Sequence, residues 1–104
     1  MLPKSERLTK NDFESIRPKV FFRGEFFDVA LVPLEATKFA CVISKKKIKR
    51  AVDRNKVKRR IFGALKESRP KSTGHFIFYI KSSAENALYG SLNKEISKAF
   101  ATLH

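Results

Sequence analysis

Residues 39–66 read FACVISKKKIKRAVDRNKVKRRIFGALK, and within this stretch the hydrophobic period changes from that of a strand to that of a helix. Phe39–Ile43 is a continuous apolar run, which predicts a strand covered on both faces and central in its sheet. From Ala51 to about Lys66 the apolar residues recur at helical spacing. They are Val57, Ile61, Ala64 and Leu65. The stretch therefore predicts a strand followed by a helix that packs by a narrow apolar stripe.

Upstream, the sequence predicts a short helix and a hairpin. Thr9 as an N-cap favours a first helix, which should end by Arg17 because Pro18 disfavours helical geometry in the residue before it. Val20–Arg23 and Phe26–Val32 are rich in aromatic and β-branched residues, and this composition predicts two hairpin strands.

Downstream, Phe76–Ile80 reads as a second apolar strand. Ser82 and Glu85 have capping-box spacing and predict the start of a C-terminal amphipathic helix. Its apolar residues are Leu88, Leu92, Ile96, Phe100 and Leu103. The predicted order is α, β, β, β, α, β, α. We expect one α+β domain over residues 1–104, with a mixed sheet of about four strands and helices mainly on one side.

The composition is that of a globular protein with an unusual charge. Of its 104 residues, 42% are hydrophobic, and 23 Lys and Arg outnumber 10 Asp and Glu, for a net charge of +13. Such a charge favours a polyanionic partner. No stretch is apolar enough to suggest a signal peptide or a membrane span, so we expect a cytoplasmic protein with no membrane partner. The single cysteine, Cys41, is expected to be a small buried hydrophobe.

Most of the charge lies in Lys45–Arg60, which has a net charge of +9 and leaves only +4 for the other 88 residues. Its candidate RNA-binding residues are Lys45, Lys46, Lys47, Lys49, Arg50, Arg54, Asn55, Lys56, Lys58, Arg59 and Arg60. Arginine offers a planar fork that matches phosphate oxygens, and lysine offers a compact charge. Asn55 adds little attraction, so we expect it to bond a phosphate, base edge or water, or else to tie down the neighbouring connection.

The order of residues in this segment resembles a family signature. Arg54-Asn55-x-x-Lys58-Arg59 follows a Lys-Lys pair and the step Arg50-Ala51, and the whole is similar to the signature of the bacterial ribonuclease P protein component. The resemblance implies a protein that binds the catalytic ribonuclease P RNA through the basic helix and assists removal of the 5′ leader from precursor tRNA. It also implies that the RNA and its Mg²⁺ ions perform the hydrolysis. It further implies a fold like that of a ribosomal-protein domain, with a left-handed crossover.

The resemblance also implies a cleft between the sheet and the basic helix where aromatic side chains contact the leader. Stacking on such rings tolerates any base. The candidates are Phe13, Arg17, Phe26, Phe27 and Phe62. Phe13 is equally well placed to pack against Leu8 as a hydrophobic staple. Since Phe26 and Phe27 alternate across a strand, only one of them should face the core.

Two residues depart from the family pattern. Phe62 stands where the family often has an arginine, and on a helical wheel it falls between Asn55 and Lys58, off the apolar stripe. His75 stands where an acidic residue is usual, and we interpret it as a surface or strand-entry residue.

Rival functions fit the sequence less well. A protein-based nuclease site would need clustered carboxylates or a partnered histidine, and we expect no catalytic residue, metal ligand set or protein-bound cofactor. The alternative is a structural RNA-binding protein such as a ribosomal protein, which shares the charge and size without requiring the signature. A DNA-binding or anionic-lipid module ranks lower. No obligate protein partner is evident.

Overall fold

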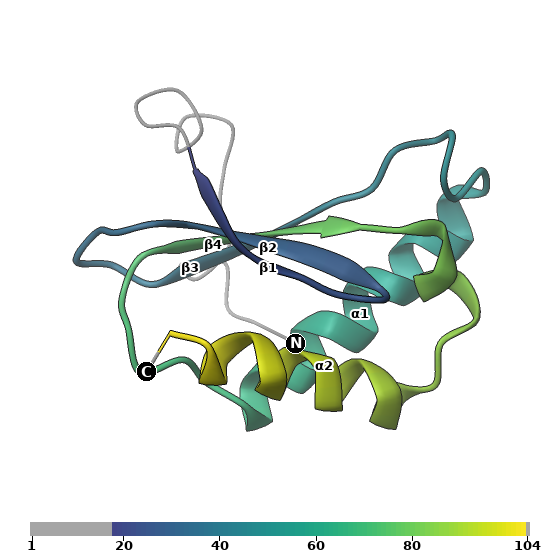
Figure 1. Cartoon of the computed structure of the whole chain (residues 1–104). Coiled ribbons are helices and arrows are strands. Elements are labelled where there is room, and N and C mark those ends of the chain that lie inside the picture. The colour runs from purple at the N-terminus through teal and green to yellow at the C-terminus, as the bar shows by residue number, and fades with distance from the viewer. Residues whose placement is uncertain (1–17, 104) are drawn as a thin grey trace.

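In the computed structural model, which describes residues 18–103, a four-stranded sheet carries two α-helices on one face (Figure 1). The strands are β1 (Lys19–Arg23), β2 (Phe27–Val32), β3 (Lys38–Val42) and β4 (His75–Ile80), and the α-helices are α1 (Ala51–Glu67) and α2 (Tyr89–Ala101). A 3₁₀ helix, η3 (Ser82–Asn86), precedes α2. The α+β class, the mixed sheet and the one-sided helices are confirmed. The predicted first helix lies outside the described residues.

The sheet order is β1-β2-β4-β3. The hairpin forms as predicted: β1 pairs antiparallel with β2, and a bulge between Val20 and Phe22 interrupts the register. Both Phe21 and Phe22 pack against the core, because the extra residue of a bulge changes which face successive side chains point to. Strand β4 pairs antiparallel with β2 and parallel with β3. Helix α1 thus forms the crossover between two parallel neighbours, and its left-handedness stays a prediction of the resemblance.

Strand β3 lies at the edge of the sheet, so its predicted central position is wrong. The apolar run arises because only the first part of the strand is covered on both faces. Phe39 is fully buried on the helix side, where its ring stacks on that of Phe76 at 5.6 Å between centroids. Ala40 is buried on the other face beside Ile77, whereas Val42 is 41% exposed. Burial on both faces therefore does not identify a central strand.

The core fills the layer between the sheet and the two helices (Figure 1). Phe27 and Phe78 face it from the sheet, with ring centroids 5.2 Å apart, and Phe100 of α2 packs edge-on against Phe76 at 5.5 Å. Burying each large apolar side chain stabilises the fold by ~1.5–3 kcal/mol. This layer fixes α1 against the sheet and leaves its other side to solvent.

The C-terminal helix begins at Tyr89, so the predicted start at Ser82 is wrong. Ser82–Asn86 is a separate 3₁₀ turn without a side-chain cap. The Ser83 hydroxyl donates to the Glu25 carbonyl at 2.6 Å, and Ala84 is fully buried. The segment docks on the β1–β2 turn before the chain turns into α2.

A buried carboxylate from α2 holds the same turn. Glu95 is 8% exposed and accepts hydrogen bonds from the backbone N–H groups of Glu25, Phe26 and Phe27 at 2.7, 2.8 and 3.2 Å. Gly24 leaves room for it, since a Cβ there would lie 2.6 Å from the Glu95 carboxyl carbon. The carboxylate ties the hairpin to α2.

Candidate nucleic-acid interface

The segment between β3 and α1 presents its cations around one buried residue. Ile48 is 1% exposed, although its neighbours on both sides are charged. The backbone N–H groups of Lys47 and Ile48 donate to the Ser44 carbonyl, both at 3.2 Å, and close a turn. The exposed cations of this loop are Lys45, Lys46, Lys47, Lys49 and Arg50. The sequence signal that would have identified Ile48 as buried is a lone isoleucine among lysines.

Arg54 joins this loop to the helix. Its Nη1 donates to the carbonyl oxygens of Ile48 at 2.9 Å and Lys49 at 2.7 Å. Arg50 is the N-cap residue, and its guanidinium lies 3.8 Å from the Asp53 carboxylate. Arg54 therefore has the tethering role that the sequence left open for Asn55. Asn55 is exposed, and its side chain makes no hydrogen bond to any residue within 18–103.

The remaining cations of α1 divide between solvent and intramolecular contacts. Lys56 and Arg59 are exposed, whereas Lys58 and Arg60 are half-buried. Arg60 Nη1 donates to the Ala87 carbonyl at 3.2 Å and so ties α1 to the segment before α2. The ten cations of the predicted RNA-binding set share one continuous segment, but they do not all present their charge in the same way.

Lys58 lies close enough to Cys41 for its positive charge to act on the thiol. Burial raises the pKa of the Cys41 thiol to about 12, and the charge of Lys58 opposes this rise. Cys41 is a free cysteine and is only partly buried, packed against the core. Cys41 therefore packs against the core as a small hydrophobe, but it is less buried than expected.

Two aromatic leader candidates belong to the core. Phe62 lies at the flank of the apolar stripe, but it is only 6% exposed because its long side chain reaches the core. Phe27 is fully buried against Phe78. Of the Phe26 and Phe27 pair, Phe26 is therefore the partly exposed ring. It lines a depression of about 240 Å³ together with Lys94 and Lys98 of α2. Phe13 and Arg17 lie outside the described residues.

His75 opens β4 as predicted, but it is 8% exposed and not a surface residue. It pairs with Val32 on one side and Lys38 on the other, on the sheet face opposite the helices. Within residues 18–103, no group of three or more His, Cys, Asp or Glu side chains is placed to hold a metal ion.

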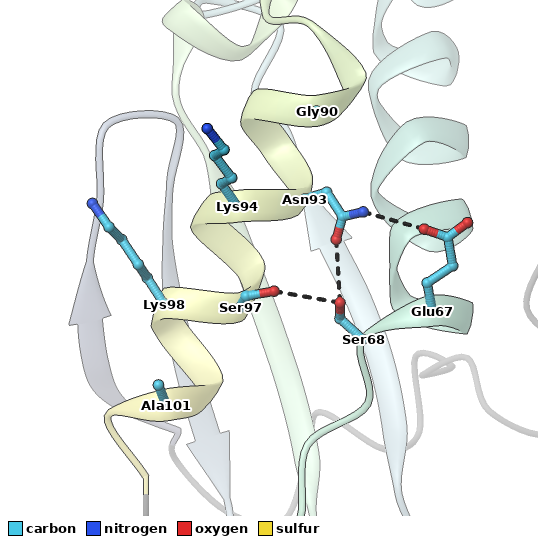
Figure 2. Close-up of a pocket in the computed structure, with 8 residues that line it drawn as sticks. All are labelled: Glu67, Ser68, Gly90, Asn93, Lys94, Ser97, Lys98 and Ala101. Atoms are coloured by element: carbon cyan, nitrogen blue, oxygen red, sulfur yellow. Dashed lines mark hydrogen bonds between the residues drawn. The ribbon is translucent and has the colours of Figure 1, made fainter.

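A shallow depression of about 690 Å³ lies where the end of α1 meets α2 (Figure 2). Its polar side chains bond to one another. Ser68 Oγ donates to Asn93 Oδ1 at 3.2 Å, Asn93 Nδ2 donates to Glu67 at 3.2 Å, and Ser68 and Ser97 lie 3.4 Å apart. Lys94 and Lys98 extend from the other side of α2 (Figure 2). The network links the two helices. It contains no nucleophilic side chain paired with a general base, which a hydrolytic site would need.

None of the described helices combines the length and apolar character needed to cross a membrane.

In comparisons with known proteins, no curated protein matches the chain. Solved structures do. The Staphylococcus aureus RNase P protein is 22% identical, with a TM-score of 0.77 over 94% of each chain. A mutant of it described as having defective mRNA degradation activity gives 0.79 at 22% identity, covering 94% of this chain and 87% of that one. The Thermotoga maritima RNase P protein gives 0.75 at 17% identity, over 89% of this chain and 93% of that one.

These likenesses establish the fold, which three solved RNase P protein chains share nearly end to end. The sequence carries the family itself, because the family model described as Ribonuclease P matches residues 2–104. With its basic segment displayed on the loop after β3 and on α1, the chain belongs to the ribonuclease P protein family.

Proposed function

We propose that this protein binds the catalytic RNA of ribonuclease P through the loop after β3 and the exposed side of α1. The observation that carries the proposal is a set of seven exposed cations whose backbone is fixed by Ile48 and Arg54. They are Lys45, Lys46, Lys47, Lys49, Arg50, Lys56 and Arg59. A rigid cationic surface binds phosphates without first losing conformational freedom. Asn55 lies among these cations with its amide available to a phosphate or base edge.

The 5′ leader of precursor tRNA is the second proposed ligand. Phe26 keeps a partly exposed ring, which lines a depression with Lys94 and Lys98 of α2. Tyr79 of β4 is a better-placed ring: it is partly exposed and pairs with Val42, which is 41% exposed at the end of β3 where the basic loop begins. This face of the sheet offers stacking and apolar contact, which suits a single strand of variable sequence. Phe13 and Arg17 stay predictions.

In this proposal the protein assists, and the RNA with its Mg²⁺ ions cleaves the phosphodiester. The protein adds a positive surface that brings two polyanions together, which otherwise repel each other. We further propose that it acts in the cytoplasm, on precursor tRNA. The mRNA degradation named for the Staphylococcus aureus protein is a second activity to assay.

The test adds purified protein to a bacterial ribonuclease P RNA at a magnesium concentration where the RNA alone is nearly inactive. We expect cleavage of precursor tRNA at the mature 5′ end, and none with protein alone. A Lys56→Ala, Arg59→Ala variant should need more protein for the same rate. If the protein gives no stimulation and instead copurifies with ribosomal subunits, it is a structural RNA-binding protein and the proposal fails.

A further inference from the structure

Two large apolar side chains are exposed where α2 begins, and one of them lies next to the basic helix α1. Leu88 is 76% exposed and Tyr89 is 41% exposed. The Tyr89 ring lies against α1 at Gly63, where a Cβ would be 3.8 Å from the ring Cε2 and 3.9 Å from the hydroxyl. Gly63 thus gives the ring close access to the helix backbone. An exposed aromatic held beside a polyanion-binding helix calls for an explanation other than core packing.

The surroundings of the Tyr89 side chain are fixed on both sides. Its ring packs on Gly63 of α1. The Glu67 carboxylate acts on the phenol, and Asn93 Nδ2 donates to the same carboxylate at 3.2 Å (Figure 2). On the other side, Arg60 donates to the Ala87 carbonyl two residues before the tyrosine. The phenol is neutral at neutral pH, as in an ordinary tyrosine, and so does not repel phosphate. Desolvation and the nearby Glu67 carboxylate raise its pKa further. The ring is preorganised, and its immobilisation costs little on binding.

Two exposed cations lie on the same side of α1 as this ring. Arg59 and Lys56 precede Gly63 by four and seven residues, the spacings that place helix side chains one and two turns apart on one face. The distance from Gly63 back to Lys56 is therefore about two helical turns, or ~11 Å. A row of two cations leading to a fixed aromatic ring matches a single nucleotide strand, with phosphates on the cations and a base on the ring.

We infer that Tyr89, flanked by Leu88, is a stacking site for an unpaired nucleotide of the RNA that α1 binds. The inference rests on the proposed function and deepens it. It extends the RNA interface from the basic segment to a second element, at a position that carries no charge. The contact adds affinity that does not depend on salt, because it neutralises no phosphate.

The test compares Tyr89→Leu with Tyr89→Phe in binding titrations against a bacterial ribonuclease P RNA at several salt concentrations. Leucine keeps an apolar side chain on Gly63 but removes the ring, and phenylalanine keeps the ring but removes the hydroxyl. We expect Tyr89→Leu to bind about tenfold more weakly with an unchanged salt slope, and Tyr89→Phe to bind within about twofold of the parent. Leu34→Ala, which truncates an exposed side chain on another loop, is the matched control and should leave binding unchanged.

A fluorescence measurement reads the stacking directly. The chain has two tyrosines and no tryptophan, so Tyr79→Phe leaves Tyr89 as the single tyrosine emitter. Saturating RNA should quench its emission well beyond the correction for RNA absorbance. Absence of quenching, or a Tyr89→Leu variant that binds as tightly as the parent, would overturn the inference while leaving the proposed function intact. If the parent protein does not bind the RNA, the proposed function itself fails.

Discussion

At the scale of single residues, Arg54 and Asn55 show what charge counting leaves out. The sequence identified both as members of the motif and left open whether Asn55 contacts RNA or steadies the neighbouring connection. The arginine does so, because its guanidinium reaches two carbonyl oxygens that a shorter amide does not contact. A motif gives residue types and spacing, but which donors are used internally depends on the path of the loop. That path depends on Ile48, whose burial requires the folded core.

Replacing Arg54 with lysine keeps the charge and shortens the side chain. We expect faster hydrogen exchange of the Lys47 and Ile48 amides, because lysine ends one bond short of the Nη1 that makes both carbonyl contacts. A charge-assisted hydrogen bond is worth ~1.5–3 kcal/mol, so RNA affinity should fall about tenfold as the loop loosens. Arg59→Lys is the control, since Arg59 is exposed, and should change neither exchange nor affinity by more than about twofold. Unchanged exchange in Arg54→Lys would remove the tethering role.

The Cys41 thiol gives a prediction in pH. With its pKa raised to about 12, the thiolate is scarce at neutral pH in the folded protein. The rate of alkylation by iodoacetamide should be slow and should rise about tenfold per pH unit beyond pH 9, where an ordinary thiol levels off. Because the folded state favours the protonated thiol, its contribution to stability is present below pH ~8.5 and is lost as pH rises toward 12. Rapid alkylation at pH 7, equal to that of the unfolded chain, would contradict this.

At the scale of elements, the apolar spacing predicted α2 but not its first residue. A capping box is a local signal, and Ser82 and Glu85 have the correct spacing for one. The tertiary contact of Ser83 with Glu25 and the burial of Ala84 outweigh it and give a 3₁₀ turn instead. Glu95 was also missed, although a lone acid between Leu92 and Ile96 on the apolar side of a helix is a visible signal. Its partners are backbone N–H groups, which sequence patterns do not reveal.

Glu95→Gln tests how strongly α2 holds the hairpin. The amide keeps one oxygen acceptor and replaces the other with a donor, which faces the N–H groups of Phe26 or Glu25 without an acceptor. Leaving such groups unsatisfied costs ~1–3 kcal/mol each, so the free energy of unfolding should fall by about that amount in urea titrations. Glu85→Gln, a more exposed acid in η3, is the control and should change stability by less than about 0.5 kcal/mol. Equal effects of the two variants would show that Glu95 does not hold α2 to the hairpin.

At the scale of the whole molecule, hydrophobic periodicity and turn residues were enough to predict the α+β class, the hairpin and the strand–helix–strand crossover. Strand position was not predictable from burial. Phe39 and Ala40 are buried on opposite faces of an edge strand, so their pattern is that of a central one. The total charge was predictable as well. Which cations are exposed and which bond to carbonyl oxygens was not. The guanidinium groups of Arg54 and Arg60 bond to carbonyl oxygens, whereas Lys56 and Arg59 are exposed.

The difference between exposed cations and cations bonded to carbonyl oxygens predicts how RNA binding depends on salt. Removing a cation that neutralises one phosphate should lower the slope of log affinity against log salt by about 0.7–0.9. Lys56→Ala and Arg59→Ala should each give up to that reduction, while Arg60→Ala, whose Nη1 bonds to Ala87, should change the slope less and lower the thermal midpoint more. Titrations of a bacterial ribonuclease P RNA from 50 to about 300 mM salt measure all three. If Arg60→Ala reduces the slope as much as Arg59→Ala, the net charge of the segment governs binding and the exposure of individual cations does not. If Lys56→Ala and Arg59→Ala reduce the slope more than Arg60→Ala does, the cations that release counterions on binding are those without backbone partners. Arg54 and Arg60 then act by shaping the surface that carries the exposed cations.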